Sequence, residues 1–302
     1  MFVIGFMCMF ALAFFEANNM KKIAGDDSIK NLMMSALVVT GFISTIIAYM
    51  VTTYTEGQLT SLNKDMEILK DYRFYLALTS EFFGMYISRK NYKDNGDNIA
   101  VINFSLFLSL VLVPIYAYFL TDLWGFNNTI KINYESGFEF CIFIVAMFLL
   151  SFLFFFDKIK NNKIKNIKTL IILPLILSNS MFMTGKLMQE YNAFFAYGMI
   201  SLFLSLFFVF LTIKGKEYKN FKKEKHQRNL IIVISTWSIA IPLNAIAIKL
   251  LAIELITLLK RISQVISGVI LDKIYKNESS LKKKDYVIIA LIFVVGLVMQ
   301  KQ

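Results

Sequence analysis

Residues 251–271 of the chain read LAIELITLLKRISQVISGVIL. This run is long enough to cross the hydrocarbon core of a bilayer, which takes roughly 20 mainly apolar residues. Its centre nevertheless carries Lys260 and Arg261. An ionisable group at that depth costs about 2.5–3.5 kcal/mol on insertion scales. The segment therefore indicates a membrane helix whose charged side chains face something other than lipid.

Apolar runs of similar length recur along the whole 302-residue chain. Apolar residues make up 57% of it and charged residues 18%, with a mean hydropathy of +0.60, whereas soluble domains are about 45–50% apolar and about 25% charged. We therefore exclude a soluble single-core protein, and ten spans leave no room for a sizeable soluble catalytic domain. The ten predicted membrane helices are residues 2–21, 31–56, 73–90, 98–121, 139–157, 168–187, 191–213, 229–248, 251–271 and 285–300.

The chain carries 32 Lys and Arg residues against 21 Asp and Glu, a net charge of +11. Most of the basic residues lie in the short loops after the first, third, fifth, seventh and ninth predicted helices. The positive-inside rule assigns these loops to the cytoplasm and both termini to the opposite side. We interpret the excess charge as membrane orientation and expect no nucleic-acid partner. Cys8 and Cys141 lie in apolar runs, which indicates packing residues rather than a disulfide or metal pair.

The ten predicted helices divide into two blocks, residues 1–157 and 158–302. Each block holds five helices, and because five is odd, the second block would insert upside down. Inverted repeats are common in secondary transporters, with the site near the membrane midplane between the halves. The predicted fold is an all-α integral membrane protein with ten transmembrane helices, formed by two inverted five-helix repeats in one membrane domain.

Polar side chains at membrane depth are the candidate site residues. At about 100° per residue, Lys260, Arg261 and Gln264 fall on one face of their helix. Two cations against one deep carboxylate leave surplus positive charge, which favours an anionic ligand, and the planar fork of Arg suits carboxylate or phosphate. The candidate substrate-binding residues are Lys260, Arg261, Gln264, Lys186, Asn179, Glu81, Glu16 and Asn19.

Structural interpretations of the same residues stay open. Lys260 or Arg261 could pair with Glu81 or Glu16 as a buried bridge. Lys186 could extend its amine to the membrane interface. Glu81 could carry a coupling proton or act only as a counter-ion.

Five plus five helices in a chain of this length resemble the drug/metabolite transporter superfamily (EamA-like). The stretches that carry the resemblance are TWSIAIP at 236–242, LLKRI at 258–262, SGVI at 267–270 and IIALIFVVGL at 288–297. Lys260 and Arg261 are similar to the lysine–arginine pair in the ninth helix of the triose-phosphate and nucleotide-sugar translocator branch. Lys186 lies where that branch has a lysine late in the sixth helix. The resemblance implies that these residues hold a substrate phosphate, although the fuller sixth-helix pattern with an arginine is absent.

The leading functional hypothesis is a secondary transporter that moves a small organic anion, such as a phosphorylated or nucleotide-activated sugar, by alternating access. One alternative is an exporter of amino acids or other zwitterions, with Glu81 facing an amine and Arg261 a carboxylate. Another is a membrane accessory subunit or enzyme for lipid-linked substrates. The sequence holds no Walker loop, HExxH motif or GxSxG elbow, so we expect no catalytic residues, cofactor or metal.

The expected partners are a small-molecule substrate, the lipid bilayer, and a coupling proton or counter-substrate. Monomer and homodimer stay open. Short loops are typical of a bacterial cytoplasmic (inner) membrane, with an organellar membrane as the alternative.

Overall fold

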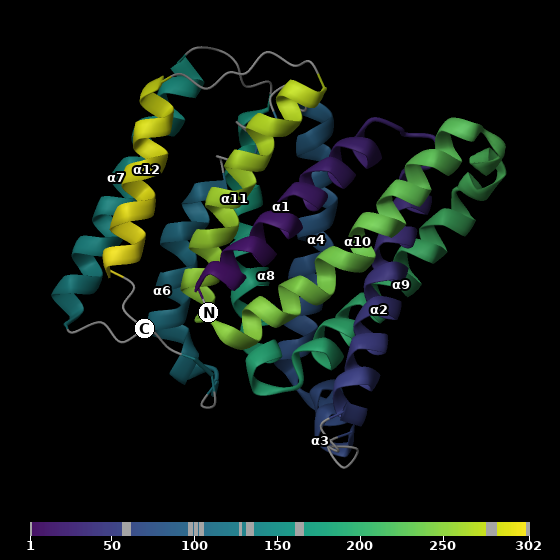
Figure 1. The fold of residues 1–302 in the computed structure, drawn as a ribbon, viewed down its shortest axis with the longest axis horizontal. Helices are drawn as coiled ribbons and strands as arrows, with labels where there is room; N and C mark the ends of the chain where they lie inside the picture. Colours follow the sequence, from purple (N-terminus) through teal and green to yellow (C-terminus); the bar gives the residue numbers. More distant parts are fainter. Residues whose placement is uncertain are drawn as a thin grey trace.

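The computed structural model describes residues 2–55, 62–95, 99, 102, 106–126, 129–130, 136–160, 166–275 and 283–299. All regular secondary structure within these ranges is helical, without a strand (Figure 1). The long helices are α1 (Phe2–Ala24), α2 (Lys30–Thr55), α4 (Tyr72–Asn95), α6 (Ser109–Leu123), α7 (Gly137–Lys160), α8 (Ile167–Glu190), α9 (Ala193–Lys214), α10 (Glu224–Leu250), α11 (Ile253–Ile274) and α12 (Lys283–Met299).

Each of these long helices overlaps one of the ten ranges predicted from the sequence. Most of the first part of the range 98–121 lies outside the described residues. The short helices are α3 (Leu62–Met66), η2 (Glu67–Lys70), η3 (Leu106–Leu108) and η4 (Glu217–Lys222). Helices α3 and η2 occupy one polar linker and η4 occupies another, and the sequence predicted no helix in either.

Among the described residues, six helices are long and apolar enough to cross a membrane: Val3–Ala24, Lys30–Thr55, Leu106–Leu123, Lys168–Glu190, Ala193–Lys214 and Glu224–Leu250. The other four long helices in the described ranges are more polar or have shorter apolar runs. Large apolar side chains such as Val145, Phe152 and Phe210 are exposed, as a lipid-facing surface requires and a water-facing one avoids. The protein is therefore an all-α, multi-pass membrane protein.

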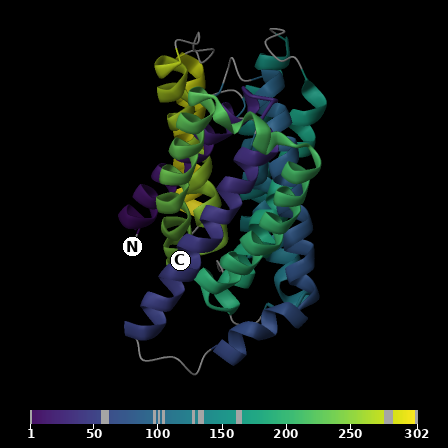
Figure 2. The same ribbon diagram turned by 90° about the vertical axis from the view of Figure 1, so that its right-hand side faces the viewer.

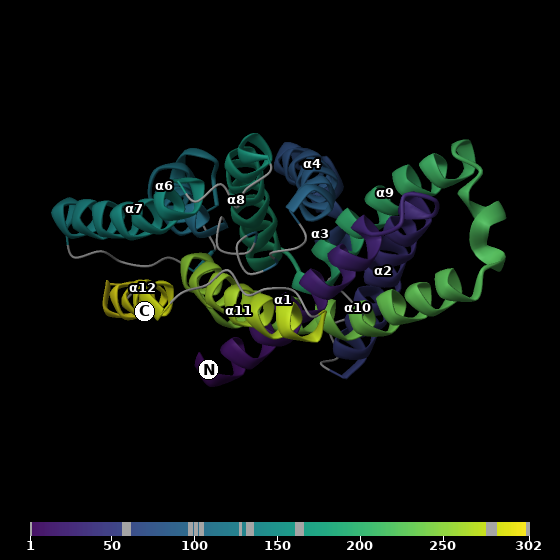
Figure 3. The ribbon, with the colours of Figure 1, turned by 90° about the horizontal axis from the view of Figure 1, so that it is seen from above.

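The helices pack in two rows, which are seen end-on in Figure 3. One row contains α7, α6, α8 and α4, and the other contains α12, α11, α1 and α10. Helix α1 packs against α10 and α11, α4 packs against α8, and α6 packs against both α8 and α11. The pair α2 and α9 lies at one end of the rows, whereas the pair α7 and α12 lies at the other.

Small residues let α2 and α9 approach each other closely. A Cβ added to Gly198 of α9 would lie 3.0 Å from the Thr45 hydroxyl oxygen of α2, and one added to Gly41 of α2 would lie 3.2 Å from the Ser201 hydroxyl oxygen of α9. Close approach through small residues is a common way for membrane helices to associate, because lipid supplies no hydrophobic drive. The contact joins the first half of the chain to the second, and both helices contribute to the lining of a cavity near the middle of the helices.

Candidate functional site

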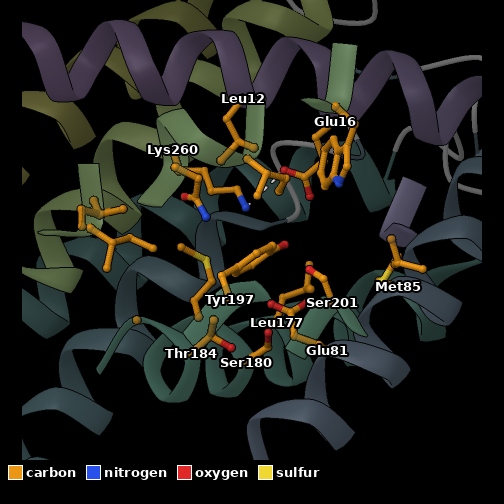
Figure 4. A pocket seen from close by; sticks show the side chains of 18 of the residues that line it. Leu12, Glu16, Glu81, Met85, Leu177, Ser180, Thr184, Tyr197, Ser201 and Lys260 are labelled. Carbon is orange, nitrogen blue, oxygen red and sulfur yellow. Dashed lines mark ion pairs between the residues drawn. The ribbon is translucent and has the colours of Figure 1, made fainter. Parts of the chain in front are cut away.

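A cavity of about 90 Å³ lies near the middle of the helices, enclosed by α1, α2, α4, α8, α9, α10 and α11 (Figure 4). One water molecule needs at least about 10–15 Å³ by this measure, so the space holds several waters or a small solute. Its polar lining residues are Glu16, Glu81, Ser180, Thr184, Tyr197, Ser201, Asn244, Lys260 and Arg261. The remaining lining is apolar and includes Trp237. Polar groups that converge on a partly apolar pocket are typical of a ligand site.

One wall of the cavity carries an ion pair between α11 and α1. The Lys260 amine lies 3.2 Å from the Glu16 carboxylate, and both side chains are largely buried. The Gln264 amide donates a second, longer contact of 3.4 Å to the same carboxylate oxygen. Glu16 is therefore held by two groups of α11, and the positive charge of Lys260 already has a partner.

The Arg261 side chain is fully buried beside this ion pair, with 1% of the residue exposed. Its guanidinium donates hydrogen bonds to the Ser109 hydroxyl at 2.6 Å, to the Gln264 amide oxygen at 2.6 Å and to the Met181 sulfur at 2.9 Å. All three partners are neutral, and no carboxylate of the described residues forms an ion pair with Arg261. Glu16 acts on this charge only at longer range.

Glu81 approaches the cavity from the opposite side, on α4. Figure 4 shows Glu81 and Ser180 facing Lys260 and Glu16 across the cavity, with the Tyr197 ring between them. The Ser180 hydroxyl contacts the Glu81 carboxylate, which also interacts electrostatically with Lys260 and Glu16. Within the described ranges, Glu81 has no ion-pair partner either.

The formal charges around the cavity therefore balance. Lys260 and Arg261 supply two positive charges, and Glu16 and Glu81 supply two negative charges. The sequence argument for surplus positive charge counted one deep carboxylate, whereas the packing of α1 and α4 brings two. After Lys260 and Glu16 have paired, Arg261 and Glu81 remain as two opposite charges on one cavity.

Four other candidate residues lie outside the cavity lining. The Lys186 amine is fully buried, so it does not extend to solvent, and it donates a 2.9 Å hydrogen bond to the Ile130 carbonyl oxygen. The Asn179 amide donates to the Ser80 hydroxyl at 2.6 Å, which joins α8 to α4. The Thr236 hydroxyl donates to the Asn19 amide oxygen at 3.0 Å, which joins α10 to α1.

The fourth candidate residue outside the cavity lining is Gln264. Its amide oxygen accepts from Arg261 and its amide nitrogen donates to Glu16, so it links the two residues. Sequence reasoning missed Ser109 and Met181, which contact the guanidinium of Arg261. Neither carries a sequence signal of this role, because a buried serine and a buried methionine are ordinary in any membrane helix.

No protein-family model matches this chain, and no curated protein matches it. What the cavity does is therefore inferred from its own residues.

Proposed function

We propose that this membrane protein is a secondary transporter for a small zwitterionic solute, which binds in the central cavity and is exposed to each side of the membrane in turn. One observation carries the proposal: Arg261 and Glu81 line the same cavity, and neither has an ion-pair partner among the described residues. A solute with one carboxylate and one ammonium group would compensate both charges at once. Each such charge-assisted hydrogen bond contributes about 1.5–3 kcal/mol.

The chemistry of each side of the cavity fits this substrate class. The planar guanidinium of Arg261 suits a carboxylate, to which it can donate two parallel hydrogen bonds. The Met181 thioether, which now accepts from one guanidinium nitrogen, is flexible enough to move aside for such a ligand. The Glu81 carboxylate accepts from an ammonium group on the other side.

The architecture proposed with this function is the ten-span inverted repeat, residues 1–157 and 158–302. If α1, α2, α4, α6 and α7 correspond in order to α8, α9, α10, α11 and α12, the principal helix contacts exchange in pairs. The contact of α1 with α10 becomes that of α8 with α4, and the contact of α1 with α11 becomes that of α8 with α6. The contacts α2–α9, α6–α11 and α7–α12 map onto themselves. A two-fold axis in the membrane plane relates inverted repeats in this way.

Two hydrogen bonds follow the same exchange. Asn19 of α1 bonds to Thr236 of α10, and Asn179 of α8 bonds to Ser80 of α4. In each case an asparagine in the first helix of one half joins the third helix of the other half. These bonds support the repeat, and they give Asn19 and Asn179 a positioning role.

An organic anion, the first substrate class predicted from the sequence, fits the cavity less well. Lys260 is already paired with Glu16, and the carboxylate of Glu81 would repel a phosphate or sulfate group. An anion transporter would require both carboxylates to be protonated or displaced when the substrate binds. The zwitterion requires neither change.

Uptake by proteoliposomes tests the proposal with a panel of zwitterionic amino acids and phosphorylated sugars. We expect flux of one or more zwitterions, with a loss of about ten-fold or more in Glu81→Gln and in Arg261→Gln, because each variant removes one charge-assisted contact. Glu67→Gln, which changes an exposed carboxylate in η2, serves as the matched control and should transport like the wild type. Flux of phosphorylated sugars that is unaffected by Glu81→Gln would contradict the proposal.

A further inference from the structure

Two linkers at opposite ends of the helices each bury a carboxylate against the start of a helix from the other half of the chain. The linker that contains η4 joins α9 to α10, and the linker that contains α3 and η2 joins α2 to α4. Figures 1 and 2 show η4 near one end of the molecule and α3 at the other end. At each end, the linker carboxylate accepts a hydrogen bond from a backbone N–H at the start of the helix that it contacts.

Glu217 forms the first of these contacts, which we name the Glu217 clamp. The residue is 6% exposed although it lies in a strongly basic linker. Its carboxylate accepts hydrogen bonds from the backbone N–H of Asn31 at 2.7 Å, from the backbone N–H of Leu32 at 3.0 Å and from the Asn31 amide at 2.6 Å. The first N–H groups of a helix have no partner within the helix, and the positive end of the helix dipole favours an anion there. Glu217 therefore caps α2.

Asp65 forms the second contact, the Asp65 clamp. It is 4% exposed, and its carboxylate accepts from the backbone N–H of Asn192 at 3.0 Å and from the Tyr49 hydroxyl at 2.9 Å. Asn192 is the N-cap residue of α9. Asp65 precedes Tyr72, the first residue of α4, by the same number of residues as Glu217 precedes Glu224, the first residue of α10.

A second polar contact accompanies each clamp. Beside the Glu217 clamp, Asp26 of the α1–α2 loop lies 2.9 Å from His226 near the start of α10. Beside the Asp65 clamp, Glu190 at the end of α8 lies 3.1 Å from Arg73 near the start of α4. Each contact joins an acidic residue before the second helix of one half to a basic side chain, histidine or arginine, near the start of the third helix of the other half.

We propose that the Glu217 clamp and the Asp65 clamp are the two closing contacts of the transporter, each of which holds one end of the cavity shut. This inference rests on the proposed alternating-access function. Helices α2 and α9, which the clamps hold, both line the cavity, through Leu37 and Val38 on α2 and Tyr197 and Ser201 on α9. The linker that holds each helix start belongs to the opposite half, so one half cannot rock away from the other at that end while its clamp is intact.

The test measures access to the cavity from each side separately. Ser201→Cys, in a background of Cys8→Ala and Cys141→Ser, gives one thiol on the cavity wall. A membrane-impermeant maleimide is applied to one face or the other of oriented vesicles that carry this protein, alone or with Asp65→Asn or Glu217→Gln. The matched controls are Glu67→Gln and Glu224→Gln, which change exposed carboxylates next to the same two linkers.

We expect Asp65→Asn to raise the labelling rate about ten-fold or more from one face and Glu217→Gln to raise it similarly from the opposite face. Both controls should label at the parent rate. Labelling that is unchanged, or that rises equally from both faces in either variant, would overturn the proposed clamps. Thermal unfolding in detergent identifies a variant that does not fold.

Milder changes keep the test informative if a carboxylate variant is unstable. Tyr49→Phe removes one donor to Asp65, and Asn31→Ala removes one donor to Glu217. Each should raise the labelling rate from the same face as the corresponding carboxylate variant, but by a smaller factor. An increase from the opposite face would refute the proposal that this clamp closes that end of the cavity. Substrate flux is measured in parallel on the wild type. If each clamp variant raises labelling from one face only but the wild type shows no flux, the clamps are retained and the transport function is rejected. If the wild type shows flux but the clamp variants raise labelling from both faces equally, the transport function is retained and the clamps are rejected.

Discussion

Two buried arginines, Arg73 and Arg261, have opposite kinds of surroundings. Arg73 lies near the start of α4, at the end of the molecule that holds the Asp65 clamp. Its guanidinium forms ion pairs with Asp71 at 2.6 Å and with Glu190 at 3.1 Å, and it donates to the Trp124 carbonyl oxygen at 3.0 Å. Its charge also lies 4.3 Å from the centre of the Phe126 ring.

Arg261 has three neutral partners and no carboxylate at ion-pair distance within the described ranges. The difference separates a structural charge from one that is open to a ligand. Two carboxylates fully compensate Arg73, so nothing further can gain by binding to it. Arg261 has its hydrogen bonds but no counter-ion in the described part of the chain, and it lines the same cavity as Glu81, which has no ion-pair partner there either.

The largest effect should follow from Arg73→Met. The change leaves Asp71 and Glu190, whose side chains are 7% and 20% exposed, without their cation. Breaking a buried ion pair from one side costs about 3–5 kcal/mol. We therefore expect the free energy of unfolding, measured in mixed detergent micelles, to fall by about 3 kcal/mol or more. If the free energy of unfolding falls by less than about 1 kcal/mol, the ion pairs of Arg73 do not stabilise the fold as proposed.

The corresponding Arg261→Met variant should affect ligand binding rather than stability. Arg261 has no ion-pair partner among the described residues, so its replacement leaves no buried carboxylate without a cation, and the Lys260–Glu16 pair remains in place. At a ligand concentration of 100 times Kd, the wild type should gain about 2.7 kcal/mol of apparent stability. Arg261→Met should lose nearly all of that gain under the same conditions. A variant that is strongly destabilised yet still responds to the zwitterion would reverse the roles of the two arginines.

The smallest effect concerns Tyr191, whose hydroxyl donates to Asp71 at 3.2 Å beside Arg73. Burial, together with the negative charge of Asp71, raises the pKa of Tyr191 to about 12. Since the unfolded tyrosine loses its proton near pH 10, the folded state loses stability as the pH rises from 10 to 12. Tyr191→Phe should be about 1 kcal/mol less stable at pH 7, and the difference should narrow above pH 10. A constant difference from pH 7 to 12 would contradict this interpretation.

Asp71 has the opposite pH dependence. Burial alone would raise the pKa of Asp71, but the hydrogen bonds and charge of Arg73 outweigh it and lower the pKa below its ordinary value. A depressed carboxyl pKa stabilises the fold above the ordinary value, near pH 4, and the stabilisation is lost as the pH falls through the lowered pKa. This contribution is therefore complete at neutral pH and should be smaller in Arg73→Met, which lacks the hydrogen bonds and charge of the guanidinium.

Each long helix overlaps a range that the sequence predicted from its apolar residues, although only six helices of the described ranges are long and apolar enough to span a membrane. The ends of the long helices were harder to predict. Polar residues suggested that one helix ends at residue 90, whereas α4 continues to Asn95. Asn91 and Asn95 are buried and bonded to each other at 2.9 Å. Tertiary burial thus extends a helix through residues that would favour a loop in water.

The site was predictable in its residue types but not in its pairings. Charge at membrane depth singled out Lys260, Arg261, Glu16 and Glu81, and these four residues line one cavity in the structure. Two of the three partners of Arg261 come from other helices, since Ser109 is 152 residues away and Met181 is 80 residues away. Which side chains of different helices meet depends on the rotation of each helix about its axis, and this rotation cannot be predicted from a local sequence pattern.

Lys186 illustrates the same limit. Its position suggested a substrate lysine, yet its amine bonds to the backbone carbonyl of Ile130. Every residue carries a backbone carbonyl, so such a partner leaves no trace in the sequence. Lys186 therefore remains a prediction for substrate binding without support from the cavity.

Competition with blocked analogues tests most directly whether Arg261 and Glu81 bind the two ends of one solute. A transported amino acid is compared with its methyl ester, which lacks the carboxylate, and with its N-acetyl derivative, which lacks the ammonium group. We predict that the unmodified zwitterion inhibits uptake of its labelled form and that both derivatives inhibit it at least about ten-fold more weakly. Inhibition by the N-acetyl anion that equals inhibition by the zwitterion would contradict the account and favour an organic-anion transporter.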